Sequence, residues 1–172
     1  MADRLPDNVD WAAGFGGRVG GGVNSGKIAE YNTPMSSRSQ KIEQVCRKYH
    51  VKALYVFGSR GAGMLQALED DAYRIPPSES DLDVGVLSPS PFSIEKKVNL
   101  TFDLEELFNA SGVDLFILQE VDAFLASNII RGERIYAEDS YLADEYDLFV
   151  LRRAGDLAEL ERQRMAMILQ EA

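Results

Sequence analysis

The sequence has little of what builds disulfide-stapled or membrane-embedded proteins. It contains one cysteine and one histidine in 172 residues. One cysteine cannot form an internal disulfide, and a lone thiol fits a reducing cytoplasm. No apolar run reaches the length needed to span a bilayer, and the first residues lack the basic and apolar regions of a secretory signal. We therefore expect a cytoplasmic protein that does not associate with membranes.

Positive charge is also scarce. There are 18 Lys and Arg residues against 28 Asp and Glu, which gives a net charge of −10. Such a surface repels phosphate backbones, so stable binding to nucleic acid is not expected. Hydrophobic residues make up 45% of the chain, which excludes a disordered acidic protein and is enough for the core of one domain.

Glycine is unevenly distributed along the chain. Residues 1–38 hold seven of the 14 glycines and four charges of each sign, so we expect a flexible, Gly-rich N-terminal appendage. The acidic excess lies wholly in residues 39–172, which we expect to form the folded domain.

Two features of the N-terminal region need separate comment. Met35 is a candidate translation start. The stretch 21–27 imitates a phosphate-binding P-loop, but it lacks the Ser or Thr after Lys27 and a preceding strand, so we reject that interpretation.

Hydrophobic periodicity predicts alternating helices and strands. Three short apolar runs predict buried strands, at 53–57, 82–87 and 113–118, and 134–137 is a shorter extended piece. Apolar spacing of three and four residues predicts helices near 40–50, 94–108, 121–131 and 142–169, with Gly155 as a candidate break in the last. The expected fold is α/β (α+β), a mixed, mostly antiparallel sheet flanked by helices with a C-terminal helical extension.

Three aspartates begin the otherwise apolar second and third strands. Asp81 and Asp83 are two residues apart, so in a strand they project from the same face, and Asp114 on an adjacent strand supplies a third carboxylate. Asp is disfavoured in strands and costly to bury, so these carboxylates need a compensating cation. Mg²⁺ is the natural candidate because it takes oxygen ligands and shares them with substrate phosphates.

A glycine turn follows the first strand. Gly58 allows the backbone to pass close to a phosphate, Ser59 offers a hydroxyl and an amide, and Arg60 supplies charge-assisted contact to a triphosphate. Together with the aspartates, the turn indicates metal-dependent phosphoryl-type transfer. Both features also have interpretations without a catalytic role. Gly58 is then an ordinary turn at the end of a strand, and Asp114 is a solvent-facing acid on an edge strand.

The segments YVFGSRGAG, SESDLDVGVL and GVDLFIL resemble the minimal nucleotidyltransferases of the DNA polymerase beta superfamily. From about Gln40 to the C-terminus, including NIIRGERIYAED and YDLFVLRRAGDL, the chain is most similar to the MntA antitoxins of HEPN/MNT toxin–antitoxin systems. The resemblance implies that Gly58 and Ser59 hold the nucleotide phosphates. It also implies that Asp81 and Asp83 bind two Mg²⁺ ions and that Asp114 assists deprotonation of the acceptor hydroxyl.

The resemblance further implies transfer of AMP from ATP to a tyrosine of a cognate HEPN ribonuclease toxin, with which the chain would form a hetero-oligomer. Two features depart from the family pattern. Residues 60–80 separate Ser59 from Asp81, about twice the usual spacing, and Gly63 lies near a position where the family often has Arg. The insertion lies beside the expected nucleotide, where it would shape base choice, cover the site or impair it.

Two other functions remain open at this stage. The chain is a candidate non-catalytic antitoxin that binds its toxin through the acidic surface and terminal helices, whose apolar stripe from Tyr146 to Leu160 otherwise belongs to the core. It is also a candidate nucleotidyltransferase for a small hydroxylated molecule such as an aminoglycoside.

Cys46 and His50 have a spacing able to share a metal, but Cys46 lies on the apolar helix face and is interpreted as a core residue.

Overall fold

The computed structural model describes residues 36–70, 72–74 and 80–170. The P-loop-like stretch 21–27, the candidate start at Met35 and the rest of the expected appendage up to residue 35 lie outside these residues. Residues 37 and 38 already belong to the first helix, α1 (Ser37–Tyr49), whose N-terminus is capped by the Ser36 hydroxyl accepting from the Ser39 N–H at 3.0 Å. No helix in the described part of the chain is long and apolar enough to cross a membrane.

Four strands form one mixed sheet in the order β3-β2-β1-β4. Strand β1 (Ala53–Phe57) runs antiparallel to both of its neighbours, β2 (Leu82–Leu87) and β4 (Glu133–Ala137). Strand β3 (Val113–Ile117) lies at one edge and pairs with β2 in parallel. The expected mixed, mostly antiparallel sheet is confirmed, and the extended piece near 134–137 is its fourth strand.

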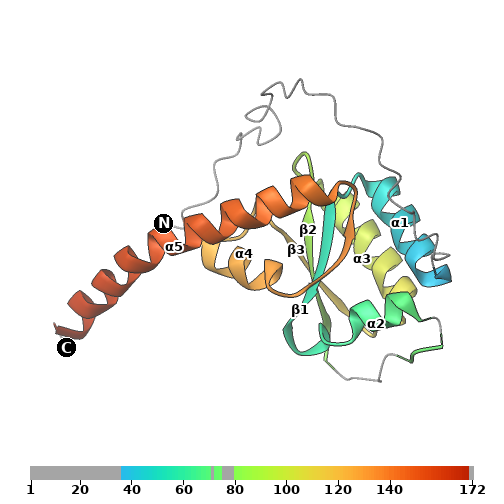
Figure 1. The fold of residues 1–172 in the computed structure, drawn as a ribbon, viewed down its shortest axis with the longest axis horizontal. Coiled ribbons are helices and arrows are strands. Elements are labelled where there is room, and N and C mark those ends of the chain that lie inside the picture. The colour runs from blue at the N-terminus through green and yellow to red at the C-terminus, as the bar shows by residue number, and fades with distance from the viewer. Residues whose placement is uncertain (1–35, 71, 75–79, 171–172) are drawn as a thin grey trace, which may run out of the picture.

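One face of the sheet is covered by α1, α2 (Met64–Glu69) and α3 (Ile94–Phe108), as Figure 1 shows. The side chains of this layer that are buried against β1 and β2 include Ile42, Cys46, Leu100 and Leu104. Cys46 is 1% exposed and burial raises the pKa of its thiol, which confirms that it is a core residue.

The other face is covered by α4 (Ala123–Ile130) and α5 (Ser140–Gln170). Tyr146, Val150 and Ile129 are buried here against Tyr55 of β1. The expected break at Gly155 is wrong, because α5 is one continuous helix that projects beyond the sheet in Figure 1. A single glycine costs a helix about 1 kcal/mol relative to alanine, which the good helix formers around Gly155 tolerate.

Helix α2 lies inside the inserted segment and was not predicted from the sequence. Its Met64, Ala67 and Leu68 side chains are buried in the core shared with α1 and β4. The last turn of α2 is also held from outside, because the Ser39 hydroxyl donates to the Leu68 carbonyl at 3.0 Å. Six residues are too few to show a helical period, and the helix depends on packing supplied by distant segments.

A polar network fastens α5 to the sheet. The buried Tyr55 hydroxyl donates to Asp147 Oδ1 at 2.7 Å, and Arg134 on β4 donates to Asp147 Oδ2 at 3.2 Å and to Asp144 Oδ1 at 2.6 Å. Burial raises the pKa of the Asp147 carboxyl, and its bond from Tyr55 and the nearby Arg134 charge oppose that rise. Because these groups come from β1, β4 and α5, the network joins one central strand and one edge strand to the helix.

Candidate active site

The predicted site residues all lie at one end of the sheet, where β1 ends and the parallel pair β2 and β3 begins. Strand pairing places Phe57 of β1 opposite Asp83 of β2, and Asp83 opposite Asp114 of β3. The connection from β1 to α2, at the lower end of the sheet in Figure 1, contains Gly58, Ser59 and Arg60. Segments that are up to 56 positions apart in the sequence therefore meet at this end.

Asp83 and Asp114 form the centre of the site. Residues paired across neighbouring strands project from the same face of a sheet, so the two carboxylates lie side by side. Asp83 is half-buried, whereas Asp114 on the edge strand is exposed. Next to them on the same face, the Phe57 and Phe116 rings meet edge to face, with centroids 5.5 Å apart. The expected adjacency of the second and third strands is confirmed. The two aspartates lie beside the contact between the Phe57 and Phe116 rings.

Asp81 lies just before β2 and is exposed. Its carboxylate lies against the backbone of Gly112, where a Cβ atom would come within 2.3 Å of Asp81 Oδ1. The Leu82 N–H donates to the Gly112 carbonyl at 3.0 Å, which joins the starts of β2 and β3. Only a residue without a side chain fits beside Asp81 here, so Gly112 helps to set where this carboxylate lies.

The three carboxylates influence one another electrostatically. The pKa of Asp83 is raised above its ordinary value, first by burial and then by the negative charges of Asp114 and Asp81. Carboxylates that repel one another favour either a proton or a cation among them. The arrangement therefore carries uncompensated negative charge at a partly desolvated position, which is a common property of metal and catalytic sites.

The glycine turn packs directly on this cluster. Gly58 has φ +70°, and a Cβ atom on it would lie 2.2 Å from Asp83 Oδ2. A short 3₁₀ turn, Gly58–Arg60, follows, and the Gly61 N–H closes it on the Gly58 carbonyl at 3.3 Å. Ser59 is exposed within this turn. Both the left-handed backbone and the contact with Asp83 require glycine at position 58.

Arg60 reaches across the base of the inserted segment. Its Nη1 donates to the carbonyl oxygen of Ser80 at 2.9 Å, immediately before Asp81. The sequence predicted a triphosphate contact for this residue, and that role stays a prediction. A guanidinium has five N–H groups, so the bond to Ser80 leaves Arg60 with further donors.

The donor chemistry of the cluster fits Mg²⁺. Carboxylate oxygens are the ligands this ion prefers, and the mutual repulsion at Asp83 is what a divalent cation would relieve. Among the described residues, no three His, Cys, Asp or Glu side chains are grouped closely enough to hold a metal ion by themselves. Mg²⁺ usually takes only one or two carboxylates and completes its shell with water and substrate phosphates, so an open pair of acids fits that mode of binding.

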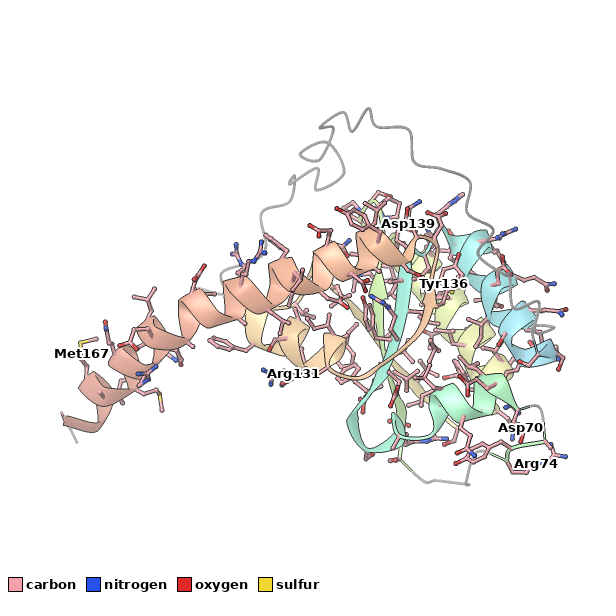
Figure 2. All side chains as sticks on the ribbon, viewed as in Figure 1. Asp70, Arg74, Arg131, Tyr136, Asp139 and Met167 are labelled. Atoms are coloured by element: carbon pink, nitrogen blue, oxygen red, sulfur yellow. The ribbon has the colours of Figure 1, made fainter. Side chains whose placement is uncertain are left out.

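Sequence reasoning missed two contributors to this end of the sheet. Gly112 was not among the predicted site residues, although it adjoins Asp81. The connection from α4 to β4 also returns here, because a Cβ atom on Gly132 would lie 2.7 Å from the Phe57 Cβ. Arg131 beside it is an exposed cation, labelled in Figure 2. Neither contact has a local signal in the sequence, since both depend on strand pairing.

Comparison with known proteins agrees with this geometry. The family model described as "Polymerase beta, Nucleotidyltransferase" matches residues 40–141. No curated protein matches the chain. Among solved structures, a chain of a toxin–antitoxin complex with AMP-PNP is similar, with 20% identity and TM-score 0.54 over 77% of this chain and 96% of that one.

Two further structures show the same fold similarity. One is described as a tri-AMPylated Shewanella oneidensis HEPN toxin in complex with an MNT antitoxin, with 18% identity and TM-score 0.51 over 77% of this chain and 94% of that one. The other is the toxin–antitoxin complex MntA-HepT, with 19% identity and TM-score 0.51 over 77% and 95%. At these identities the likeness establishes the fold, and the family match covers all six predicted site residues.

Proposed function

Because the chain belongs to the polymerase beta nucleotidyltransferase family, we propose that it transfers AMP from ATP to a hydroxyl group, namely a tyrosine of a HEPN-type toxin. The observation that carries the proposal is the alignment of Asp83 with Asp114 directly against the Gly58 turn. This alignment brings the carboxylates and the glycine turn together at one end of the sheet. In-line phosphoryl-type transfer needs these two components, because it depends on positioning and charge neutralisation.

Each residue has a role in this proposal. Asp81, Asp83 and Asp114 would hold two Mg²⁺ ions, which when bound neutralise charge on the triphosphate. The Gly58 and Ser59 amides and the Ser59 hydroxyl hold phosphate oxygens. Asp114, the exposed acid, takes the proton of the acceptor hydroxyl. The acceptor oxygen then forms a bond to the α-phosphorus, and the bond to pyrophosphate breaks.

The neighbouring structures support the choice of acceptor. They are described as toxin–antitoxin complexes, one with AMP-PNP and one with an AMPylated HEPN toxin. The described residues favour the same choice, because beyond the sheet they supply only its flanking helices and little structure for enclosing a small-molecule acceptor. A protein acceptor brings its own surface and needs no such enclosure.

A labelling experiment tests the proposal. The purified protein is incubated with a purified HEPN-type toxin, Mg²⁺ and each of the four nucleoside triphosphates, and the products are read by intact mass. We expect added AMP on the partner from ATP, and loss of the addition in the Asp81→Asn/Asp83→Asn double variant. Asp156→Asn, on the exposed surface of α5, is the matched control. Undiminished labelling by the double variant would refute the mechanism. A double variant that cannot label but still neutralises the toxin would instead identify a binding antitoxin.

A further inference from the structure

The 19 residues 61–79 between Arg60 and Ser80 begin and end beside the candidate site. They include α2, whose buried side chains belong to the core, and the exposed residues Ala72 and Arg74. Figure 2 shows Asp70 and Arg74 at the outer edge of this segment, pointing away from the sheet. The second half of the insertion leads directly into Asp81, so anything that holds its base also affects where that carboxylate lies.

The Arg60 side chain spans this base. It extends from the glycine turn to the Ser80 carbonyl, a hydrogen bond of 2.9 Å between residues 20 positions apart. On the far side, the Leu82 N–H is bonded to the Gly112 carbonyl, and the Asp81 carboxylate lies against Gly112. Asp81 is therefore flanked by two cross-links, one to the β1 turn and one to the start of β3.

We infer that Arg60 is a positioning residue, which closes the base of the insertion and holds Asp81 in reach of Asp83. The physical reason is entropic. Ser80 lies just before β2, and a charge-assisted hydrogen bond from Arg60 to its carbonyl restricts the backbone where it enters the strand. The inference rests on the proposed function, because that function is what gives the position of Asp81 a role in catalysis. The hydrogen bond itself is a feature of the protein alone and is tested without any substrate.

The bond has a direct readout in hydrogen exchange of the protein without ligands. The amide of Leu82 is protected by the Gly112 carbonyl, so its exchange rate reports opening of the segment from Ser80 to Leu82. We expect exchange at Leu82 to rise about three- to tenfold in Arg60→Met, which keeps the bulk of the side chain and removes its donors. Arg60→Lys keeps one charged donor and should restore part of the protection. Arg74→Met, in the same insertion and exposed, is the matched control.

The second readout is Mn²⁺ binding in the absence of nucleotide, measured by electron paramagnetic resonance. We expect Arg60→Met to weaken Mn²⁺ binding about three- to tenfold, and Arg74→Met to leave it unchanged. If the role of Arg60 were limited to triphosphate contact, its loss would weaken binding of AMP-PNP and leave both the Leu82 exchange rate and Mn²⁺ affinity unaltered.

These two measurements separate the possible failures. Unchanged exchange at Leu82 in Arg60→Met overturns the inference whether or not the protein is a nucleotidyltransferase. Faster exchange with unchanged Mn²⁺ affinity overturns the positioning role. If the wild-type protein binds no Mn²⁺ either alone or with AMP-PNP, the proposed metal chemistry fails, and the exchange experiment still decides whether Arg60 holds the segment. Thermal unfolding of each variant checks that the fold is retained.

Discussion

Asp83 and Asp114 stand opposite each other at the start of two parallel strands, 31 positions apart in the sequence. Both project from the face that α4 and α5 cover further along the sheet, and the charge of Asp114 contributes to the raised pKa of Asp83. Two acids in adjacent register destabilise a folded protein unless something binds them. This relationship connects the stability of the domain to its proposed chemistry, and the first two predictions follow from it.

Replacing Asp83 with Asn is expected to stabilise the unliganded protein at neutral pH. Because the folded pKa of Asp83 lies above the unfolded value, the folded state binds its proton more tightly. Stability is therefore lost as pH rises from the unfolded pKa through the folded one. At pH 7 the variant should be more stable by about 0.5 kcal/mol, a small value because Asp83 is only partly buried and solvent screens its charge. Urea unfolding at pH 7 and at about pH 3, below the unfolded pKa, measures the difference, which should vanish at the lower pH. A variant less stable than wild type at pH 7 would contradict this reasoning.

Adding Mg²⁺ with AMP-PNP is expected to raise the unfolding temperature. A ligand present at ten times its dissociation constant stabilises the folded state by about 1.4 kcal/mol, which corresponds to a few degrees for a domain of this size. The rise should be absent in Asp83→Asn and reduced in Asp114→Asn, because each removes a carboxylate ligand. Differential scanning fluorimetry checks this, with NaCl at equal ionic strength as the control. An equal rise in all three proteins would show that the acids do not hold the metal.

Gly58→Ala tests the contact between the turn and the acid. The backbone at this position has φ +70°, and the new Cβ would lie 2.2 Å from Asp83 Oδ2. We expect a loss of about 1–2 kcal/mol from the left-handed backbone alone. A carboxylate displaced by about 1 Å should lower the labelling rate about 100-fold. Urea unfolding and the AMP-transfer assay measure the two effects. Labelling at the wild-type rate would show that Asp83 does not need its present position.

Gly155→Ala is expected to stabilise the protein, in contrast to Gly58→Ala. Gly155 lies in the middle of α5, and a Cβ atom there has no neighbour within 4 Å. Alanine should stabilise the protein by about 0.5–1 kcal/mol, because it restricts the unfolded chain and favours the helix. Thermal unfolding measures the gain, and AMP transfer should be unchanged because the position is remote from the acids. A destabilised variant would mean that α5 bends or packs at Gly155 in solution.

Asp147→Ala should be the most destabilising of these substitutions. It leaves the buried Tyr55 hydroxyl and Arg134 without the acceptor that joins β1 and β4 to α5. We expect a loss of about 2–3 kcal/mol, and about 1 kcal/mol for Tyr55→Phe, which removes only a donor. In the double variant the two losses should not add, because both belong to the same hydrogen bond. Urea unfolding of the four proteins completes the cycle, and strict additivity would contradict the coupling.

Local sequence was sufficient for most of the regular structure. The strands at 53–57 and 82–87 were predicted to the residue, because continuous apolar runs bounded by Gly, Pro and Ser specify buried strands without help from distant segments. Helices with strong apolar periodicity, such as α1 and α3, were also predicted from the sequence. Helix α2 was missed because six residues carry no period, and Gly155 was overestimated as a break because its flanking residues favour helix.

The sequence by itself identified the residues that we propose carry the chemistry. Asp81 and Asp83 share a face because neighbouring side chains in a strand alternate, and Gly58 follows a buried strand at a turn. Only the tertiary structure decided how they meet: the parallel register of Asp83 with Asp114, the approach of Gly112 to Asp81, and the bond from Arg60 to Ser80. Side-chain alternation is a property of each strand alone, whereas register depends on the packing of α3, α4 and the core between distant segments.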